Sequence, residues 1–159
     1  MQSHYDREMV KPMWQELADI GVKPFTSAAE VDDFMASSTG TSLIVVNSVC
    51  GCAAGNARPG VALALQNNVI PDHLATVFAG VDREATDKAR KYIKGYPPSS
   101  PSVALFKNGQ VVFVLERHQI EGAPAEEVAA ELTTAFDQHC SKGGPSVSHE
   151  QLKKAFGLA

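Results

Sequence analysis

The chain has 159 residues, of which 44% are hydrophobic and 20% are charged, and its formal net charge is −4. This composition is typical of one globular domain with a substantial core, and the lack of a basic excess argues against nucleic acid as a partner. No apolar run has the length of a membrane span, and the polar segment 1–8 is unlike a secretory signal, so we expect a cytoplasmic protein with no membrane partner.

The first part of the chain predicts two helices and a buried strand. Apolar residues recur at helical spacing over 5–20, and Gly21 is a typical helix stop. Pro12 falls inside this pattern and is expected either to delay the start of the helix or to kink it. A capping-box pattern opens a second helix over 26–35. The run 43–49 is apolar and β-branched without alternation, which is typical of a central strand covered on both faces.

The rest of the chain alternates between helices and strands. The expected elements are, in order, a helix over 52–68 kinked at Pro59, a strand over 74–81, a helix over 82–94, strands over 103–106 and 111–116, and a helix over 125–140. Asn108-Gly109 predicts a type I′ turn between the last two strands. Residues 143–145 are expected to form a linker to a short helix around Leu152 and Phe156. This order predicts an α/β fold, a mixed sheet with helices on both faces and an extra N-terminal helix.

Two cysteines separated by one glycine follow the predicted central strand, where a helix begins. The free N–H groups and the positive dipole end of a helix N-terminus stabilise a thiolate and lower its pKa, which favours Cys50 as a nucleophile. Cys52 could then displace what Cys50 captures. Residues two apart in a regular helix point to opposite sides, so a Cys50–Cys52 bond requires Cys50 to stand outside the helix, with Gly51 supplying conformational freedom. Such a small ring should be strained and easily reduced.

Inert packing and metal binding are the alternatives for this cysteine pair. Buried free cysteines are common, and a structural zinc site needs four ligands, usually in two close pairs. Cys140 and the five histidines supply no second pair, so no metal site is expected. Cys140 is interpreted as structural, and His118 and His139 as surface residues. Three cysteines in a chain without a visible signal favour a reducing cytosol, where disulfides are transient and catalytic.

The run 46–59 contains the cysteine pair, the small residues that follow it and an Arg-Pro pair. It closely resembles the signature of the bacilliredoxins, small thioredoxin-like bacterial proteins with a CGC motif, long described as a domain of unknown function. The resemblance extends from Tyr5 to Cys140. It implies a thioredoxin-like domain over 1–140 with a C-terminal extension over 141–159.

The resemblance also implies a reaction, a thiol–disulfide exchange. Cys50 would attack a mixed disulfide on a client protein and accept bacillithiol or a similar low-molecular-weight thiol. Cys52, or another thiol, would then release that group. The small thiol is a co-substrate in this scheme, and no tightly bound cofactor is implied. Alternative functions are a protein disulfide isomerase or reductase, and a non-enzymatic redox sensor or thiol-metal carrier.

Further substrate-binding residues are expected around the cysteine pair. In thioredoxin-like folds a cis-proline precedes the third strand, so we expect a cis Ser100-Pro101 bond within the proline-rich segment 97–102, whose alternative is a plain turn. The backbone of Ser100 would then hydrogen-bond a peptide or thiol ligand. Arg58 lies about two turns beyond Cys50 and could attract a carboxylated thiol, although a surface or interface position is equally compatible. Gly51 completes this predicted set.

Overall fold

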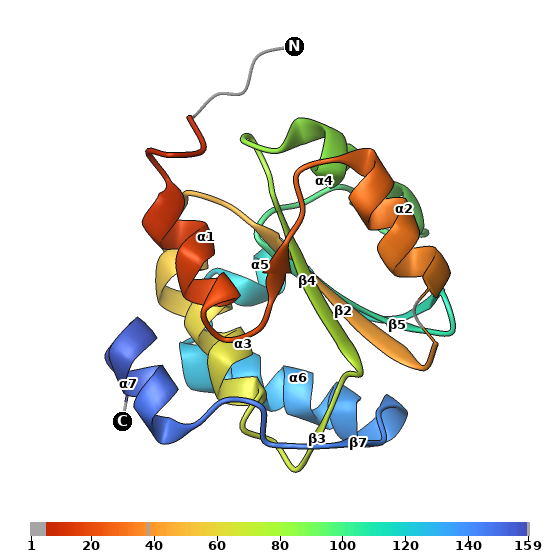
Figure 1. Cartoon of the computed structure of the whole chain (residues 1–159). Coiled ribbons are helices and arrows are strands. Elements are labelled where there is room, and N and C mark those ends of the chain that lie inside the picture. Colours follow the sequence, from red (N-terminus) through yellow and green to blue (C-terminus); the bar gives the residue numbers. More distant parts are fainter. Residues whose placement is uncertain (1–5, 38, 159) are drawn as a thin grey trace.

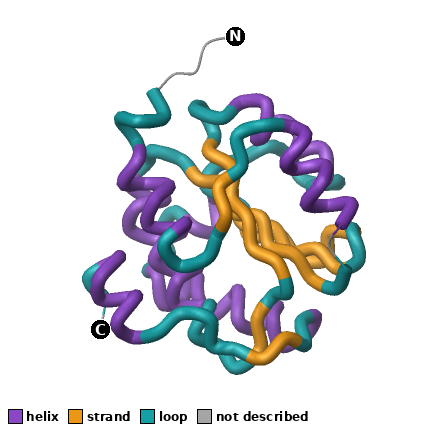
Figure 2. Tube along the Cα trace, viewed as in Figure 1, coloured by secondary structure: helices purple, strands orange, loops and turns teal. Residues whose placement is uncertain are grey.

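The computed structural model describes residues 6–37 and 39–158, and within them the chain forms a five-stranded sheet between two layers of helices (Figures 1 and 2). The strands, in spatial order, are β1 (Lys23–Pro24), β4 (His73–Phe78), β2 (Thr41–Asn47), β5 (Ser102–Lys107) and β6 (Gln110–Leu115). The first three are parallel, and β5 and β6 are antiparallel to their neighbours. The predicted mixed sheet is therefore confirmed.

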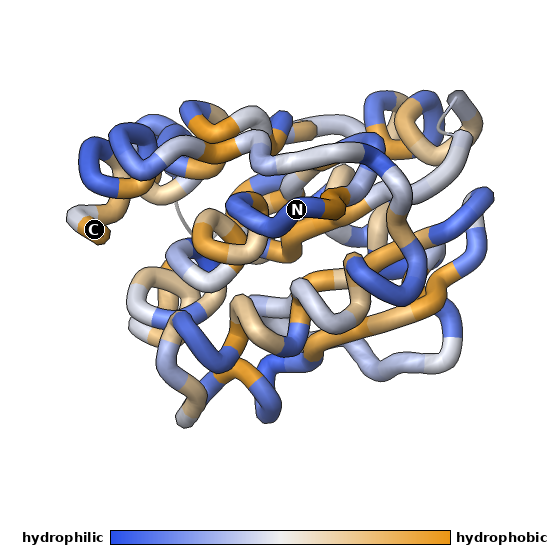
Figure 3. The backbone as a smooth tube through the Cα atoms, turned by 90° about the horizontal axis from the view of Figure 1, so that it is seen from below, coloured by the Kyte–Doolittle hydropathy of each residue, from blue (hydrophilic) through white to orange (hydrophobic). Residues whose placement is uncertain are grey.

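Strand β2 lies at the centre of the sheet, and all seven of its residues are buried. Leu43 and Val45 face one hydrophobic core, whereas Ile44 and Val46 face the other. Burial on both faces explains why the strand sequence shows no alternation of apolar and polar residues. Figure 3 shows hydrophobic stretches running through the interior, with hydrophilic stretches mostly at the periphery.

Helices cover both faces of the sheet, as predicted. The first core is shared by α1 (Lys11–Ala18), α3 (Arg58–Ala64), α6 (Ala125–His139) and α7 (His149–Phe156). The second core is shared by α2 (Ala28–Ser37) and α4 (Arg83–Tyr92). Figure 1 shows α2 and α4 on the side of the sheet opposite to α1, α3 and α6. Among the described residues, no helix is long and hydrophobic enough to cross a bilayer.

The N-terminal helix begins later than the apolar pattern over 5–20 predicts. Helix α1 starts at Lys11, and Pro12 lies in its first turn. A proline is tolerated there because the N–H groups of the first turn have no partner inside the helix. Pro12 therefore delays the helix rather than kinking it. Residue 5 lies outside the described residues.

The central strand and the helix after it also differ from their predicted bounds. Strand β2 ends at Asn47, two residues before the predicted end. The expected helix over 52–68 consists of a π-helical turn, η1 (Ala53–Ala57), followed by α3. The N–H of Arg58 bonds to the carbonyl of Ala53, five residues back. Since Pro59 has no N–H, the ladder cannot continue regularly there, and the irregularity expected at Pro59 takes the form of this π-helical turn.

The C-terminal segment packs into the domain through contacts that the sequence did not suggest. Strand β7 (Lys142–Gly143) pairs with β3 (Val69–Ile70), so the first residue of the linker expected over 143–145 belongs to a strand, and residues 144 and 145 connect that strand to the last helix. Gly144 lies so close to the carbonyl of Asn67 that a Cβ would come within 2.2 Å of its oxygen. The predicted short helix is confirmed as α7, and its Leu152 is fully buried. The boundary after residue 140 stays a prediction.

The turn between β5 and β6 is confirmed, and a short helix that was not predicted follows β6. Asn108 and Gly109 have φ angles of 50° and 80°, as a type I′ turn requires. Helix α5 (Arg117–Ile120) begins with a capping box in which Glu116 and Gln119 bond to each other's backbone N–H. The pattern was missed because glutamate is an uncommon first residue of such a box. Helix α5 brings Arg117 toward the cysteine loop.

Candidate active site

Cys50 occupies the N-cap position of the helical segment after β2. Its carbonyl accepts hydrogen bonds from the N–H groups of Ala53 and Ala54, at 3.1 and 3.2 Å. Cys50 itself is not helical, whereas Gly51 and Cys52 are. The expectation that Cys50 stands outside regular helix is therefore confirmed. A side chain at this position faces the first free N–H groups of the helix.

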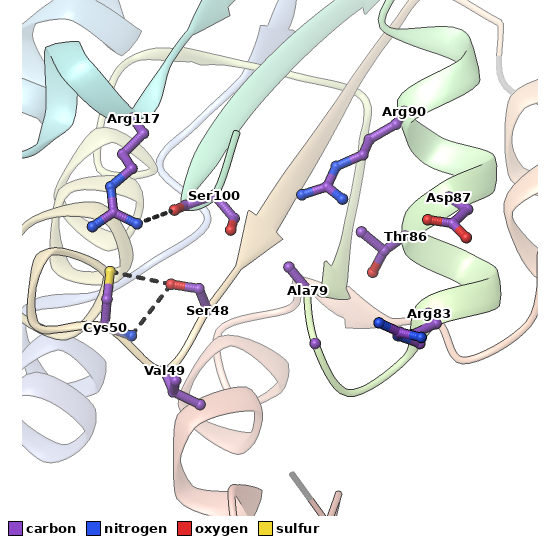
Figure 4. Close-up of a pocket in the computed structure, with 11 residues that line it drawn as sticks. Ser48, Val49, Cys50, Ala79, Arg83, Thr86, Asp87, Arg90, Ser100 and Arg117 are labelled. Carbon is purple, nitrogen blue, oxygen red and sulfur yellow. Dashed lines mark hydrogen bonds between the residues drawn. The ribbon is translucent and has the colours of Figure 1, made fainter. Parts of the chain in front are cut away.

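The thiol of Cys50 is surrounded by hydrogen-bond donors. The Sγ atoms of Cys50 and Cys52 are 2.6 Å apart, and both residues are free, half-buried thiols. The Ser48 hydroxyl donates to the Cys50 Sγ at 3.2 Å and accepts from the Cys50 N–H at 3.3 Å (Figure 4). Ser48 is itself buried, so its hydroxyl is held in place.

These contacts give the two thiols opposite tendencies to ionise. Partial burial acts to raise the pKa of Cys50, but hydrogen bonds from Cys52, Ser48 and the backbone N–H of Ala53 outweigh it and leave that pKa below its ordinary value. Burial raises the pKa of Cys52, and so does the thiol of Cys50 beside it, while the charge of Arg117 acts in the other direction. At neutral pH, Cys50 is thus the better nucleophile, and Cys52 keeps its proton as a donor.

Replacing Ser48 with alanine should move the ionisation of Cys50 to higher pH, because the thiolate loses a hydrogen bond from a buried hydroxyl. The midpoint of the pH dependence of iodoacetamide alkylation at Cys50 measures this change, with Cys52→Ala and Cys140→Ser in the background to isolate one thiol. Ser146→Ala, a serine remote from the cysteines in sequence, is the matched control. An unchanged midpoint in Ser48→Ala would contradict the assigned role of the hydroxyl.

Gly51 is exposed and helical in the protein with free thiols. Its φ angle lies outside the left-handed region, and a Cβ there would meet no other heavy atom within 4 Å. The freedom that Gly51 was expected to supply concerns the Cys50–Cys52 disulfide, and because both thiols are free here that expectation stays a prediction. The absence of a side chain leaves the approach to the cysteine pair open. Contact of Gly51 with substrate stays a prediction.

Arg58 points into the protein rather than toward the cysteine pair. The residue is only 4% exposed, and its guanidinium forms a salt bridge with Glu16. Its Nη1 donates to Asn47 Oδ1 at 2.9 Å and to the Ser48 carbonyl at 3.1 Å. Asn47 Oδ1 also accepts from the Ser48 N–H at 2.9 Å, and its Nδ2 donates to the Met13 carbonyl. With its donors used in this way, Arg58 positions the loop that carries Ser48.

The loop before β5 meets the cysteine loop at the same edge of the sheet. The Ser100-Pro101 bond is cis, as expected. Ser100 lines a pocket together with Cys50, and its carbonyl accepts a hydrogen bond from Arg117 Nη1 at 3.0 Å (Figure 4). Helix α5 is anchored to η1 by a bond from Asn56 Nδ2 to a backbone carbonyl of α5, at 2.8 Å.

Three arginines at this pocket were not predicted as site residues. Arg83, Arg90 and Arg117 line it together with Cys50. Arg83 and Arg90 are seven residues apart and so lie on one face of α4, but a polar helix gives no indication of which face meets a functional loop. Arg117 comes from the unpredicted helix α5.

The remaining titratable side chains do not gather around the cysteines. Burial raises the pKa of Cys140, which is half-buried and packs against the first core. His118 is exposed and His139 is half-exposed. Within residues 6–37 and 39–158, no three His, Cys, Asp or Glu side chains come together as metal ligands, so none joins Cys50 and Cys52.

Comparison with known proteins gives consistent matches. A family model described as disulphide isomerase matches residues 5–140. A bacilliredoxin of Shouchella clausii is 51% identical over 138 residues, which cover 87% of this chain and 95% of that protein. A bacilliredoxin of Cytophaga hutchinsonii is 52% identical over 134 residues, covering 84% and 98%. Among solved structures, the oxidised mitochondrial thioredoxin 3 of Saccharomyces cerevisiae matches 76% of this chain and 98% of its own chain, with a TM-score of 0.51 and 16% sequence identity. This structural similarity confirms the thioredoxin-like fold.

Proposed function

The chain belongs to the bacilliredoxin family, and we propose that it is a thiol–disulfide oxidoreductase that removes bacillithiol, or a similar low-molecular-weight thiol, from mixed disulfides on client proteins. The observation that carries this proposal is the pair of free sulfurs 2.6 Å apart, one with a lowered and the other with a raised pKa. In a pair of this kind, one thiol is ionised and attacks the substrate disulfide, and the second thiol then resolves the mixed disulfide that forms.

The first step is attack by the Cys50 thiolate on the small-thiol sulfur of the mixed disulfide. The disulfide of the client breaks, a new disulfide forms between Cys50 and the small thiol, and the client leaves as a thiolate that takes a proton from water. The hydrogen bonds from Ser48 and Cys52 stabilise the thiolate before attack. The exposed Gly51 leaves room for a client protein at this point.

The second step releases the small thiol. Cys52 loses its proton to solvent and attacks the sulfur of Cys50, so that the small thiol leaves as a thiolate and a Cys50–Cys52 disulfide forms. Two electrons have then passed from the dithiol to the mixed disulfide. An external thiol must reduce this disulfide before another cycle. Alternatively, an external thiol could attack the sulfur of the small thiol, which would release the Cys50 thiolate without the participation of Cys52.

Disulfide isomerisation or reduction is a second candidate, favoured by the description of the matching family model. In that reaction Cys50 would attack a disulfide within a client and form a mixed disulfide with the client itself. In isomerisation a different thiol of the client would then displace Cys50, whereas in reduction Cys52 would attack the sulfur of Cys50 and release the client as a thiolate. Both candidates use the same nucleophile, and they differ in which sulfur remains attached to Cys50.

The Cys52→Ala variant tests the proposal because it should stop the reaction after the first step. We expect this variant, incubated with a bacillithiol-loaded model client, to gain the mass of one bacillithiol on Cys50 while the client loses it. Cys50→Ser is the matched control and should gain no mass. Capture of the client itself would support the isomerase or reductase. A folded variant that captures nothing, together with metal retained through purification by the protein with both cysteines, would support a thiol-metal carrier.

A further inference from the structure

A pocket beside Cys50 presents three arginines to one open space (Figure 4). Its volume is about 480 Å³, within the range of small-molecule sites. Arg83 and Arg90 extend into it from α4, and Arg117 extends from the opposite side, where the sulfur of Cys50 lies. We call this space the arginine pocket, defined by these three arginines and Cys50.

Two of the arginines have buried nitrogen atoms without a partner. Among the described residues, Arg83 Nη1 and Arg90 Nε are shielded from solvent and have no hydrogen-bond partner. A buried donor on a charged group is costly when it has no acceptor. Nearly all buried polar groups in folded proteins have a partner, so an exception at a pocket wall points to an acceptor that arrives with a ligand.

The charges around the pocket indicate what that ligand is. Asp87 is the carboxylate that lines it, so three arginines face one carboxylate and the Cys50 thiolate. Arg83 and Arg90 are two helical turns apart, which places their Cα atoms about 10 Å from each other. A guanidinium binds a carboxylate through charge-assisted hydrogen bonds. The pocket therefore matches a ligand whose carboxylates lie at one end and whose sulfur lies near Cys50.

Resting on the exchange proposed for Cys50, we infer that the arginine pocket binds the carboxylates of the small thiol and selects anionic, carboxylated cargo. Arg83 and Arg90 hold the carboxylates, and the small-thiol sulfur is thereby directed toward the Cys50 thiolate. This placement also decides which of the two sulfurs of a mixed disulfide is attacked. The volume of about 480 Å³ is that of a small-molecule site, which favours a small molecule over an acidic segment of a client.

Symmetric disulfides of different charge test this inference. The reduced Cys52→Ala protein is mixed with oxidised glutathione, which is anionic, with 2-hydroxyethyl disulfide, which is neutral, or with cystamine, which is cationic. Mass addition at Cys50 gives each rate, normalised to the rate of the same disulfide with a free small thiol. We expect the normalised rate to be highest for oxidised glutathione and lowest for cystamine.

The Arg83→Gln and Arg90→Gln variants then locate this preference. Each should slow the reaction with oxidised glutathione about tenfold, because the loss of one charge-assisted hydrogen bond to a carboxylate corresponds to about this factor. Each should leave the reaction with 2-hydroxyethyl disulfide unchanged, because that disulfide has no carboxylate. Lys91→Gln removes a charge from the same helix outside the pocket and should change neither rate. In the parent protein, higher salt should slow the reaction with oxidised glutathione and should not slow the reactions with the other two disulfides. This test does not depend on how well a variant folds.

The outcomes separate this inference from the proposed function. If Arg83→Gln and Arg90→Gln slowed the reactions with the charged and the neutral disulfides equally, the arginines would act on the Cys50 thiolate. That result would overturn the inference. Equal normalised rates for all three disulfides in the parent protein would also overturn it, with exchange at Cys50 intact. A slower reaction of Arg83→Gln and Arg90→Gln with an acidic disulfide-bearing peptide, at an unchanged rate with oxidised glutathione, would assign the pocket to the client. Failure of the parent protein to react with any disulfide would instead refute the proposed function.

Discussion

Cys50→Ser is expected to slow the release of bacillithiol from a loaded client by about a thousandfold or more, because it removes the only thiol placed for the first attack. Serine preserves the shape of the side chain, but its hydroxyl does not ionise near neutral pH. The Ser48 hydroxyl and the N–H groups at the start of the helix then have no thiolate to stabilise. The rate is measured from the mass of the client under single-turnover conditions.

Two further serine substitutions complete this comparison. Cys52→Ser should retain the first step and lose the formation of the Cys50–Cys52 disulfide, so that the small thiol stays on the protein. Cys140→Ser should leave the rate unchanged, because Cys140 packs against the core away from the pocket. Full activity of Cys50→Ser would exclude the assigned nucleophile, and loss of activity in Cys140→Ser would show that the third thiol takes part.

The features predicted correctly from the sequence depend on residues close together in the chain. The apolar, β-branched run in β2 predicted burial on both faces, which the two cores confirm. Asn108-Gly109 predicted the turn of the β5–β6 hairpin, because the φ angles of a type I′ turn depend on the two turn residues themselves. The position of Cys50 before a helix also follows from the order of strand, glycine and small residues.

The features that were missed depend on contacts between distant segments. Arg58 was expected near the substrate, but its direction is set by Glu16 on α1 and by Asn47 at the end of β2. The arginine pocket combines α4 with α5, and no local pattern brings these helices together. Strands β3 and β7 contain two residues each, too few to show any periodicity.

Arg58→Met is expected to lower the free energy of unfolding by about 3 kcal/mol, the lower end of the range for breaking a buried ion pair. The substitution leaves Asn47 Oδ1 and the Ser48 carbonyl without this donor and leaves the carboxylate of Glu16 unpaired. The lower end applies because the Glu16 side chain is 23% exposed and keeps part of its hydration. Urea denaturation of the reduced protein measures the change.

Two variants serve as controls for this measurement. Arg58→Lys keeps the charge but not the planar fork of donors, so it should lower stability by an intermediate amount. Arg117→Met removes an exposed arginine that pairs with Glu121 and donates to the Ser100 carbonyl, and should change stability by no more than about 1 kcal/mol. Equal effects of Arg58→Met and Arg117→Met would contradict the structural role given to Arg58.

Arg58 should also influence the reactivity of Cys50, although it does not touch the sulfur. It fixes Ser48 twice, directly through the Ser48 carbonyl and indirectly through Asn47, which accepts from the Ser48 N–H. Since the Ser48 hydroxyl stabilises the thiolate, a looser Ser48 should shift the midpoint of Cys50 alkylation to higher pH in folded Arg58→Met. A purely structural arginine would change stability alone. An unchanged alkylation midpoint in folded Arg58→Met would therefore show that Arg58 stabilises the fold without affecting the ionisation of Cys50.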